Sequence, residues 1–171
     1  TDLQHSAGYR AAREILPATI EAIEKLYQTK KNYTGVPAGF DDLDALTSGF
    51  QQSEMVILGA RPSIGKTALA LTMAANIAIR QSIPVGFFTL EMSEQALMQR
   101  LLSMEARLDS NRLRTGLLKQ SDFQSILEAS GRIYEAPLFI DDTPSMKLVD
   151  LRAQARRMKA QEDLQIIFVD Y

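Results

Sequence analysis

The sequence predicts an α/β protein with a mainly parallel sheet that carries helices on both faces. From Glu54 onward, short apolar runs of strand length alternate with longer segments of helical spacing. The runs are apolar throughout, as in strands buried on both faces of a parallel sheet. They are "MVILGA", "VGFFTL", "APLFID" and "LQIIFVD". The helical segments between them cover residues 66–80, 94–107, 121–134 and 147–161.

Composition and charge exclude several classes of protein. The 171 residues are 46% hydrophobic and 23% charged, which suits one soluble domain with a core. Without cysteine there are no disulfides or Cys-based metal sites, and the lone His5 cannot build a metal site. A net charge of −2 predicts no general attraction to DNA or membranes. The longest uncharged run, 67–79, is shorter than the about 20 residues that span a bilayer. With no signal sequence at its start, we expect a cytoplasmic protein with no membrane partner.

The first part of the chain predicts a helix on a tether. Its apolar side chains recur at helical spacing, on Leu16, Ile20, Ile23 and Tyr27. Because proline fits best in the first turn of a helix, Pro17 predicts a helix over about 17–29. The polar segment 29–40, "TKKNYTGVPAGF", contains Gly and Pro and predicts a linker. The apolar stripe either folds back on its own domain or docks on another chain.

The stretch "ILGARPSIGKTALALTM", residues 57–73, nearly matches a phosphate-binding loop. That pattern is Gly, four residues, then Gly-Lys-Ser/Thr, between a strand and a helix. Ala60 occupies the first glycine position, where alanine can serve if its φ is negative. Backbone N–H groups around 63–68 would point at the phosphates, aided by the positive end of the helix. Lys66 would add a charge and Thr67 a hydroxyl for Mg²⁺. A turn that merely caps a buried helix is the alternative, and the flanking elements favour the phosphate cradle.

Two acidic residues follow predicted strands. Asp170 ends "QIIFVD" at the carboxyl edge of the sheet, where ligands bind in open α/β folds. We interpret it as a carboxylate linked to Mg²⁺ rather than as a helix cap. Glu91 follows "VGFFTL" at the same edge. The residues alone leave two roles open for Glu91: a base that orients water, or a cap of the helix that begins near Ser93.

Two further charged groups have local interpretations. Asp141 and Asp142 precede "TPS", a turn and helix start, so a cap is favoured over a metal site. Arg152 and Arg156 lie one turn apart, opposite the apolar face of their helix. A solvated helix face is favoured there over contact with nucleic acid.

Six motifs together resemble the DnaB-type replicative helicases, a branch of the RecA-like ATPases. They cover nearly everything after residue 34, and their combination is more specific than the phosphate loop alone. The motifs are "TGVPAGFDDLDALTSGFQ" (34–51), "ARPSIGKTA" (60–68), "TLEMSEQAL" (89–97), "RLRTG" (112–116), "IDDTPS" (140–145) and "IIFVDY" (166–171). The resemblance accounts for Ala60, because this family commonly has Ala-Arg-Pro-Ser at that position.

The resemblance implies a RecA-like P-loop core, over 35–171, preceded by a linker helix within 1–34. It implies an ATP- and Mg²⁺-dependent homohexameric ring that moves along single-stranded DNA and unwinds the duplex, with primase and a helicase loader as partners. Lys66 and Glu91 become catalytic residues, and Thr67 and Asp170 become metal ligands, Asp170 on the Walker B strand. The nucleotide-binding residues are Ala60, Arg61, Pro62, Ser63, Ile64, Gly65, Lys66, Thr67 and Ala68. The helix before residue 34 resembles the one that packs on the neighbouring subunit.

The chain begins with Thr1 and stops on a strand-like run, so we expect a piece of a longer protein, truncated at the Walker B strand. The family's DNA-binding loops and trans-acting arginine would follow Tyr171. Two alternatives remain. Another RecA-like ring ATPase, in recombination or signalling, would not be expected to carry "SGFQ", "TLEMS" and "IDDTPS" together. A non-catalytic nucleotide-binding assembly module would have no need of Glu91.

Overall fold

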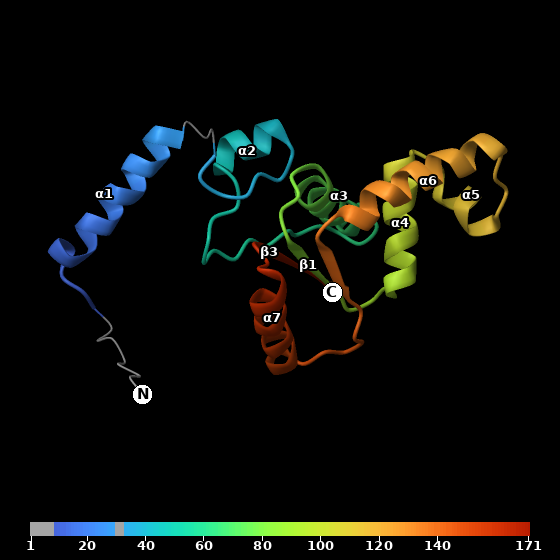
Figure 1. The fold of residues 1–171 in the computed structure, drawn as a ribbon. Coiled ribbons are helices and arrows are strands. Elements are labelled where there is room, and N and C mark those ends of the chain that lie inside the picture. The colour runs from blue at the N-terminus through green and yellow to red at the C-terminus, as the bar shows by residue number, and fades with distance from the viewer. Residues whose placement is uncertain (1–8, 30–32) are drawn as a thin grey trace.

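A three-stranded parallel sheet forms the centre of the fold. The structure, a computed structural model, describes residues 9–29 and 33–171, so His5 lies outside the described residues. The strands are β1 (Val85–Thr89), β2 (Leu138–Asp141) and β3 (Ile166–Asp170), in the order β2-β1-β3. Figure 1 shows β1 and β3 at the centre of the fold, among the helices. All three strands were predicted from their apolar runs, and the α/β fold with a parallel sheet is confirmed.

Helices cover both faces of this sheet. The four predicted helical segments form α3 (Lys66–Ala75) with its continuation η1 (Asn76–Arg80), α4 (Glu94–Ala106), α6 (Gln120–Glu135) and α7 (Leu148–Glu162). Two short helices, α2 (Asp41–Thr47) and α5 (Ser110–Thr115), were not predicted. With only one or two turns each, they are too short to show a hydrophobic period. Among the helices of the described residues, none is long and apolar enough to cross a membrane.

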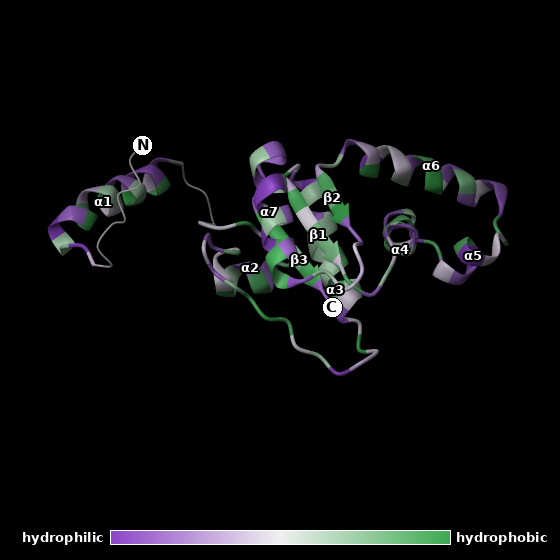
Figure 2. Ribbon diagram, turned by 90° about the horizontal axis from the view of Figure 1, so that it is seen from below, coloured by the Kyte–Doolittle hydropathy of each residue, from purple (hydrophilic) through white to green (hydrophobic). Residues whose placement is uncertain are grey.

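The central strand β1 is buried on both sides. Phe87 faces the core formed with α3, η1 and α4, and its ring stacks on that of Phe168 at 5.8 Å between centroids. Phe88 faces the opposite way and packs with Met158 of α7 and Leu164. This two-sided burial explains why the strand reads as a continuous apolar run. Figure 2 shows the same apolar sheet between the helices.

The predicted strand "MVILGA" does not form. Residues 54–60 have no regular secondary structure, and Met55 is 85% exposed. An apolar run becomes a strand only when another strand accepts its backbone hydrogen bonds. Among the described residues β3 is an edge strand of the sheet, and residues 54–60 do not pair with it. The prediction was wrong because the composition of a segment indicates its tendency to form a strand, but not whether another strand is available to pair with it.

Helix α1 (Ala12–Thr29) stands apart from the sheet and its covering helices (Figure 1). It begins five residues before the predicted start, so Pro17 lies in the second turn rather than the first. Alanine, arginine and glutamate have high helix propensity, which carries the helix through residues 12–14, and proline removes only one hydrogen bond there. The whole predicted stripe, from Leu16 to Tyr27, is exposed. In this structure the stripe does not fold back on its own domain.

The second half of the predicted linker packs on the domain. Ala38 is buried, and its carbonyl accepts a hydrogen bond of 3.1 Å from Asn76 Nδ2 at the start of η1. Buried Asp44 accepts hydrogen bonds from the amides of Ala38 (2.6 Å) and Gly39 (3.0 Å). A Cβ at Gly39, where φ is +85°, would lie 2.5 Å from Asn76 Nδ2, so only glycine allows this approach. The segment from Val36 onward is therefore ordered, although its composition is typical of a linker.

Core packing predicts a sharp contrast between two leucines. Leu101 of α4 is fully buried, whereas Leu127 of α6 is 71% exposed. Leu101→Ala should lower the free energy of unfolding by about 2–5 kcal/mol, because it leaves a cavity. Leu127→Ala should change it by about 0.5 kcal/mol or less. Urea unfolding of both variants measures this. Equal losses would contradict the described packing of α4.

Candidate functional site at the carboxyl edge of the sheet

The loop before α3 has the shape of an anion cradle. Ser63 and Gly65 have φ values of +64° and +108°. Gly65 directly precedes α3, and its carbonyl accepts the amide of Leu69 at 2.9 Å. A Cβ built on Gly65 meets no atom within 4 Å, so the space above this residue is open. The first N–H groups of α3 face no partner within their own helix and suit a bound anion.

Lys66 and Thr67 meet Asp170, which is 103 residues beyond Thr67 in the chain. Thr67 Oγ1 donates a hydrogen bond of 2.7 Å to Asp170 Oδ2. Lys66 Nζ lies 3.9 Å from Asp170 Oδ1 and donates to the carbonyl of Tyr171 at 3.2 Å. These contacts bring Lys66, Thr67 and Asp170 together at the carboxyl edge of the sheet.

Tyr171 is a neighbour that the sequence did not indicate. The ammonium of Lys66 lies 5.5 Å from the centroid of its ring, within the range of a cation–π contact. No sequence motif indicates this contact, because it depends on where β3 ends relative to the start of α3.

Glu91 lies beside Asp170 through the pairing of their strands. Thr89 is in register with Asp170, and the amide of Leu90 donates to the Asp170 carbonyl at 2.9 Å. Glu91 follows directly and is exposed. The N-cap of α4 is Ser93, whose hydroxyl accepts the amide of Ala96 at 3.2 Å. Since Ser93 fills the cap, the local alternative for Glu91 does not match this structure.

Asp141 makes a local bond, as predicted, whereas the prediction of a local cap is wrong for Asp142. Asp141 Oδ1 accepts the amide of Thr143 at 2.9 Å, which is a local turn. Asp142 Oδ2 instead accepts the amide of Glu94 at 2.9 Å, at the start of α4. In residues 9–29 and 33–171, no group of three or more His, Cys, Asp or Glu side chains is placed to hold a metal ion. The long-range bond of Asp142 was missed by sequence reasoning.

Arg152 and Arg156 lie on the exposed side of α7, as the solvated-face interpretation predicts. The apolar face opposite them is shorter than the sequence suggested. Met158 is buried, whereas Leu148 at the start of the helix is exposed.

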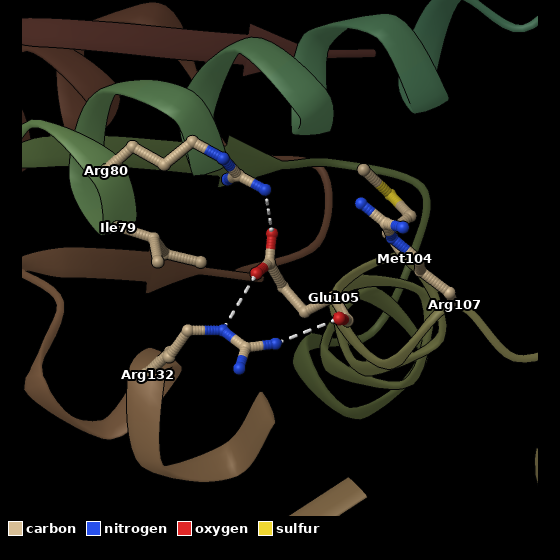
Figure 3. Close-up of a pocket in the computed structure, with 6 residues that line it drawn as sticks. All are labelled: Ile79, Arg80, Met104, Glu105, Arg107 and Arg132. Atoms are coloured by element: carbon tan, nitrogen blue, oxygen red, sulfur yellow. Dashed lines mark hydrogen bonds and ion pairs between the residues drawn. The ribbon is translucent and has the colours of Figure 1, made fainter. Parts of the chain in front are cut away.

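A cavity among the described residues lies away from this edge of the sheet. It measures about 410 Å³ and is lined by Ile79, Arg80, Met104, Glu105, Arg107 and Arg132 (Figure 3). Glu105 lies near the far end of α4, roughly 16 Å along the helix from Glu94. Its carboxylate pairs with Arg80 at 3.0 Å and with Arg132 at 3.5 Å. These ion pairs tie η1, α4 and α6 together, so the cavity is a by-product of a structural cluster away from the phosphate loop.

The fold and the edge site define the class. A parallel sheet, a Gly-Lys-Thr loop opening α3, and an acid at the end of the adjacent β3 are typical of RecA-like P-loop ATPase domains. Two solved structures share this fold. The chain matches a solved ATPase domain with a TM-score of 0.85 and 26% identity, over 97% of this chain and 58% of that one. It matches a DnaB-like replicative helicase, from a study of its interactions with primase, with a TM-score of 0.81 and 27% identity, over 95% of this chain and 39% of that one.

The chain belongs to the family of the DnaB-like helicase C-terminal domain, whose model matches residues 35–171. It is 52% identical to the replicative DNA helicase DnaB of Treponema pallidum (strain Nichols), over all of this chain and 39% of that protein. It is 42% identical to the replicative DNA helicase DnaB of Geobacillus stearothermophilus, over 98% of this chain and 37% of that protein. The chain thus spans about two fifths of the length of these relatives.

The geometry of Lys66 predicts that it contributes little to stability. Its side chain is 36% exposed, and its loose ion pair with Asp170 is of a kind worth about 0–1 kcal/mol. Its contacts with the carbonyl and ring of Tyr171 are also solvent-exposed, at the end of β3. Lys66→Ala should therefore melt within a few degrees of the parent, since about 1 kcal/mol corresponds to roughly 2–4 °C in a domain of this size. Asp44→Ala should melt clearly lower, because it leaves two amides of the 36–39 segment without their acceptor. Thermal melts of both variants measure this, and loss of cooperative melting in Lys66→Ala would make that lysine structural.

Proposed function

We propose that the chain is part of the motor of a ring-shaped replicative helicase that uses ATP to move along single-stranded DNA and separate the duplex. One observation carries the proposal: Lys66 and Thr67 of the loop meet Asp170 at the carboxyl edge of the sheet. The family and the full-length match to replicative helicases support it. Residues 35–171 would form the motor part and residues 1–34 the linker.

The residues of the edge fit ATP and Mg²⁺. Hydroxyl and carboxylate oxygens are the ligands that Mg²⁺ prefers, and Thr67 Oγ1 and Asp170 Oδ2 lie 2.7 Å apart. Thr67 would bind the metal through its hydroxyl, and Asp170 would hold the metal through a water molecule. The loop from Ala60 to Ala68 would surround the phosphates, with the open space above Gly65 admitting them. When bound, Mg²⁺ supplies positive charge that offsets the charge developing on the phosphates.

Lys66 and Glu91 would carry the chemistry. The Lys66 ammonium would offset charge on the β- and γ-phosphates as the bond to the leaving group breaks. Glu91 would orient a water molecule and accept its proton during attack on the γ-phosphate. Glu91 is exposed, and the residue before it, Leu90, is bonded to the Asp170 carbonyl at the carboxyl edge of the sheet. This arrangement separates binding, by the loop, from hydrolysis, by Glu91.

The exposed face of α1 supports assembly into a homohexamer. When a neighbour buries the solvent-exposed apolar stripe of an isolated helix, each large aliphatic side chain contributes roughly 1.5–3 kcal/mol of binding free energy. We place that neighbour in the next subunit, which makes the contact heterologous and able to close into a ring. Single-stranded DNA, primase and a helicase loader are the further proposed partners. The place of action would be the replication fork, in the cytoplasm of a bacterial or phage-infected cell.

Changing Glu91 should separate nucleotide binding from hydrolysis. In the full-length protein, Glu91→Gln should keep its nucleotide affinity but slow hydrolysis by roughly two to four orders of magnitude, the usual contribution of a positioned base. Lys66→Ala should abolish turnover. Steady-state ATPase rates and equilibrium binding of Mg²⁺–ADP test this. Glu94→Gln is the control, because it changes an exposed glutamate three residues away. Turnover of Glu91→Gln equal to that of the control would reject the catalytic role.

Changing the α1 stripe should weaken the ring. The double substitution Ile20→Ser and Ile23→Ser removes two exposed aliphatic side chains, so the domain's own melting temperature should hardly change. Sedimentation of the full-length protein should show fewer hexamers, and turnover should fall where sites form between subunits. Glu21→Ser with Lys25→Ser, on the polar face of the same helix, is the control. An intact hexamer with a destabilised domain would place the contact of α1 on its own domain.

A further inference from the structure

The turn that carries Glu91 is held on its strand side by a buried hydroxyl. Thr89 ends β1 and is 1% exposed. Its Oγ1 accepts a hydrogen bond from the amide of Met92 at 3.3 Å and donates to the carbonyl of the same residue at 3.1 Å. The Met92 side chain packs against the core on α3 and α4. Both backbone groups of the residue after Glu91 are therefore tied to the sheet.

The same turn is held on its helix side by Asp142. Its Oδ2 accepts the amide of Glu94, the first residue of α4, at 2.9 Å across 48 residues of chain. The register pairs Phe88 with Asp141, the last residue of β2, so Asp142 is the first residue beyond that strand, as Thr89 is the first beyond the last paired position of β1 with β2. Thr89 pairs with Asp170 of β3, and Asp142 follows β2 on the other side of β1, so all three residues lie at the carboxyl ends of the strands.

These bonds leave Glu91 with little freedom in its backbone. Leu90 before it is bonded to the Asp170 carbonyl, and Met92 and Glu94 after it are bonded to Thr89 and Asp142. In the described residues no hydrogen bond holds the Glu91 carboxylate itself. The turn beneath it therefore sets the point from which the Glu91 side chain projects.

We propose that Thr89 and Asp142 are positioning residues for Glu91, holding its turn from the strand side and the helix side. The proposal rests on the proposed function of Glu91 as the base. Neither residue is required to touch ATP, metal or water. Because displacement of a reacting group by about 1 Å can cost 10²-fold in rate, loosening this turn should reduce turnover without reducing nucleotide binding.

Pairs of variants in the full-length protein test the proposal. Asp142→Ala removes the acceptor of the Glu94 amide, whereas Asp142→Asn keeps an acceptor oxygen and loses the charge. Thr89→Val removes the hydroxyl at equal size, whereas Thr89→Ser keeps it. We expect kcat to fall roughly ten- to hundredfold in Asp142→Ala and Thr89→Val. The Asn and Ser variants should restore most of it, and the Kd for Mg²⁺–ADP should stay within about threefold of the parent in all four.

Three outcomes would overturn the proposal. If Asp142→Asn is as slow as Asp142→Ala, the charge matters and not the bond to α4. If the Kd for Mg²⁺–ADP rises together with the loss of kcat, the edge has been disrupted as a whole. If the control Asp141→Ala, which removes a neighbouring carboxylate with a purely local bond, slows turnover equally, the strand end matters rather than the turn.

A double variant separates this proposal from the function on which it rests. Asp142→Ala added to Glu91→Gln should cause little further loss, because both changes act through one carboxylate. A full additional loss would show that Asp142 acts independently of Glu91 and would end the positioning role. Normal turnover in Glu91→Gln alone would reject Glu91 as the base. Normal turnover in Asp142→Ala and Thr89→Val, beside a slow Glu91→Gln, would reject only the positioning.

Discussion

The parallel pairing of β1 with β3 is the constraint on which the site depends. It places Thr89 opposite Asp170, and it continues past the strand ends through the bond from the Leu90 amide to the Asp170 carbonyl. Since the carboxyl ends of parallel strands meet at one edge, the acid of β3 and the turn after β1 must be neighbours. Helix α3 brings Lys66 and Thr67 to the same edge, where Thr67 bonds to Asp170. Without this register, residues from distant parts of the chain would share no surface.

The burial of β1 on both sides keeps this register unique. A shift by one residue would exchange Phe87 and Phe88 between the α3 side and the α7 side of the sheet. It would also break the stacking of Phe87 on Phe168. Gly86 adds a second restriction, because a Cβ there would lie 2.8 Å from Leu164 Cδ1. Packing thus determines to within one residue where the turn with Glu91 begins.

Helix α1 differs from the helices that hold the turn with Glu91 in place. Glu105, with Arg80 and Arg132, joins α4 to η1 and α6, so the helix that follows Glu91 has a fixed far end. Asp142 holds its near end. Helix α1 stands apart from the sheet, and its stripe stays exposed. The site is therefore built on rigid elements, whereas the element we assign to assembly is separate from them.

Much of the site and fold could be predicted, because local signals encode it. The burial of whole strands shows in continuous apolar runs, and the signal of Gly65, Lys66 and Thr67 is carried by adjacent residues and the helix after them, although the strand expected before them does not form. The position of Asp170 followed from its place at a strand end. These features depend on residues that are close in the sequence, so periodicity and spacing report them.

Only the tertiary structure decided the remaining features. The apolar run 54–60 stayed unpaired, the bond of Asp142 reached Glu94 rather than its own turn, and the ring of Tyr171 came to lie against Lys66. In each case the outcome depends on which distant backbone or side chain comes within hydrogen-bonding distance. A sequence states what a residue can donate, accept or bury, and the folded chain alone supplies its partner.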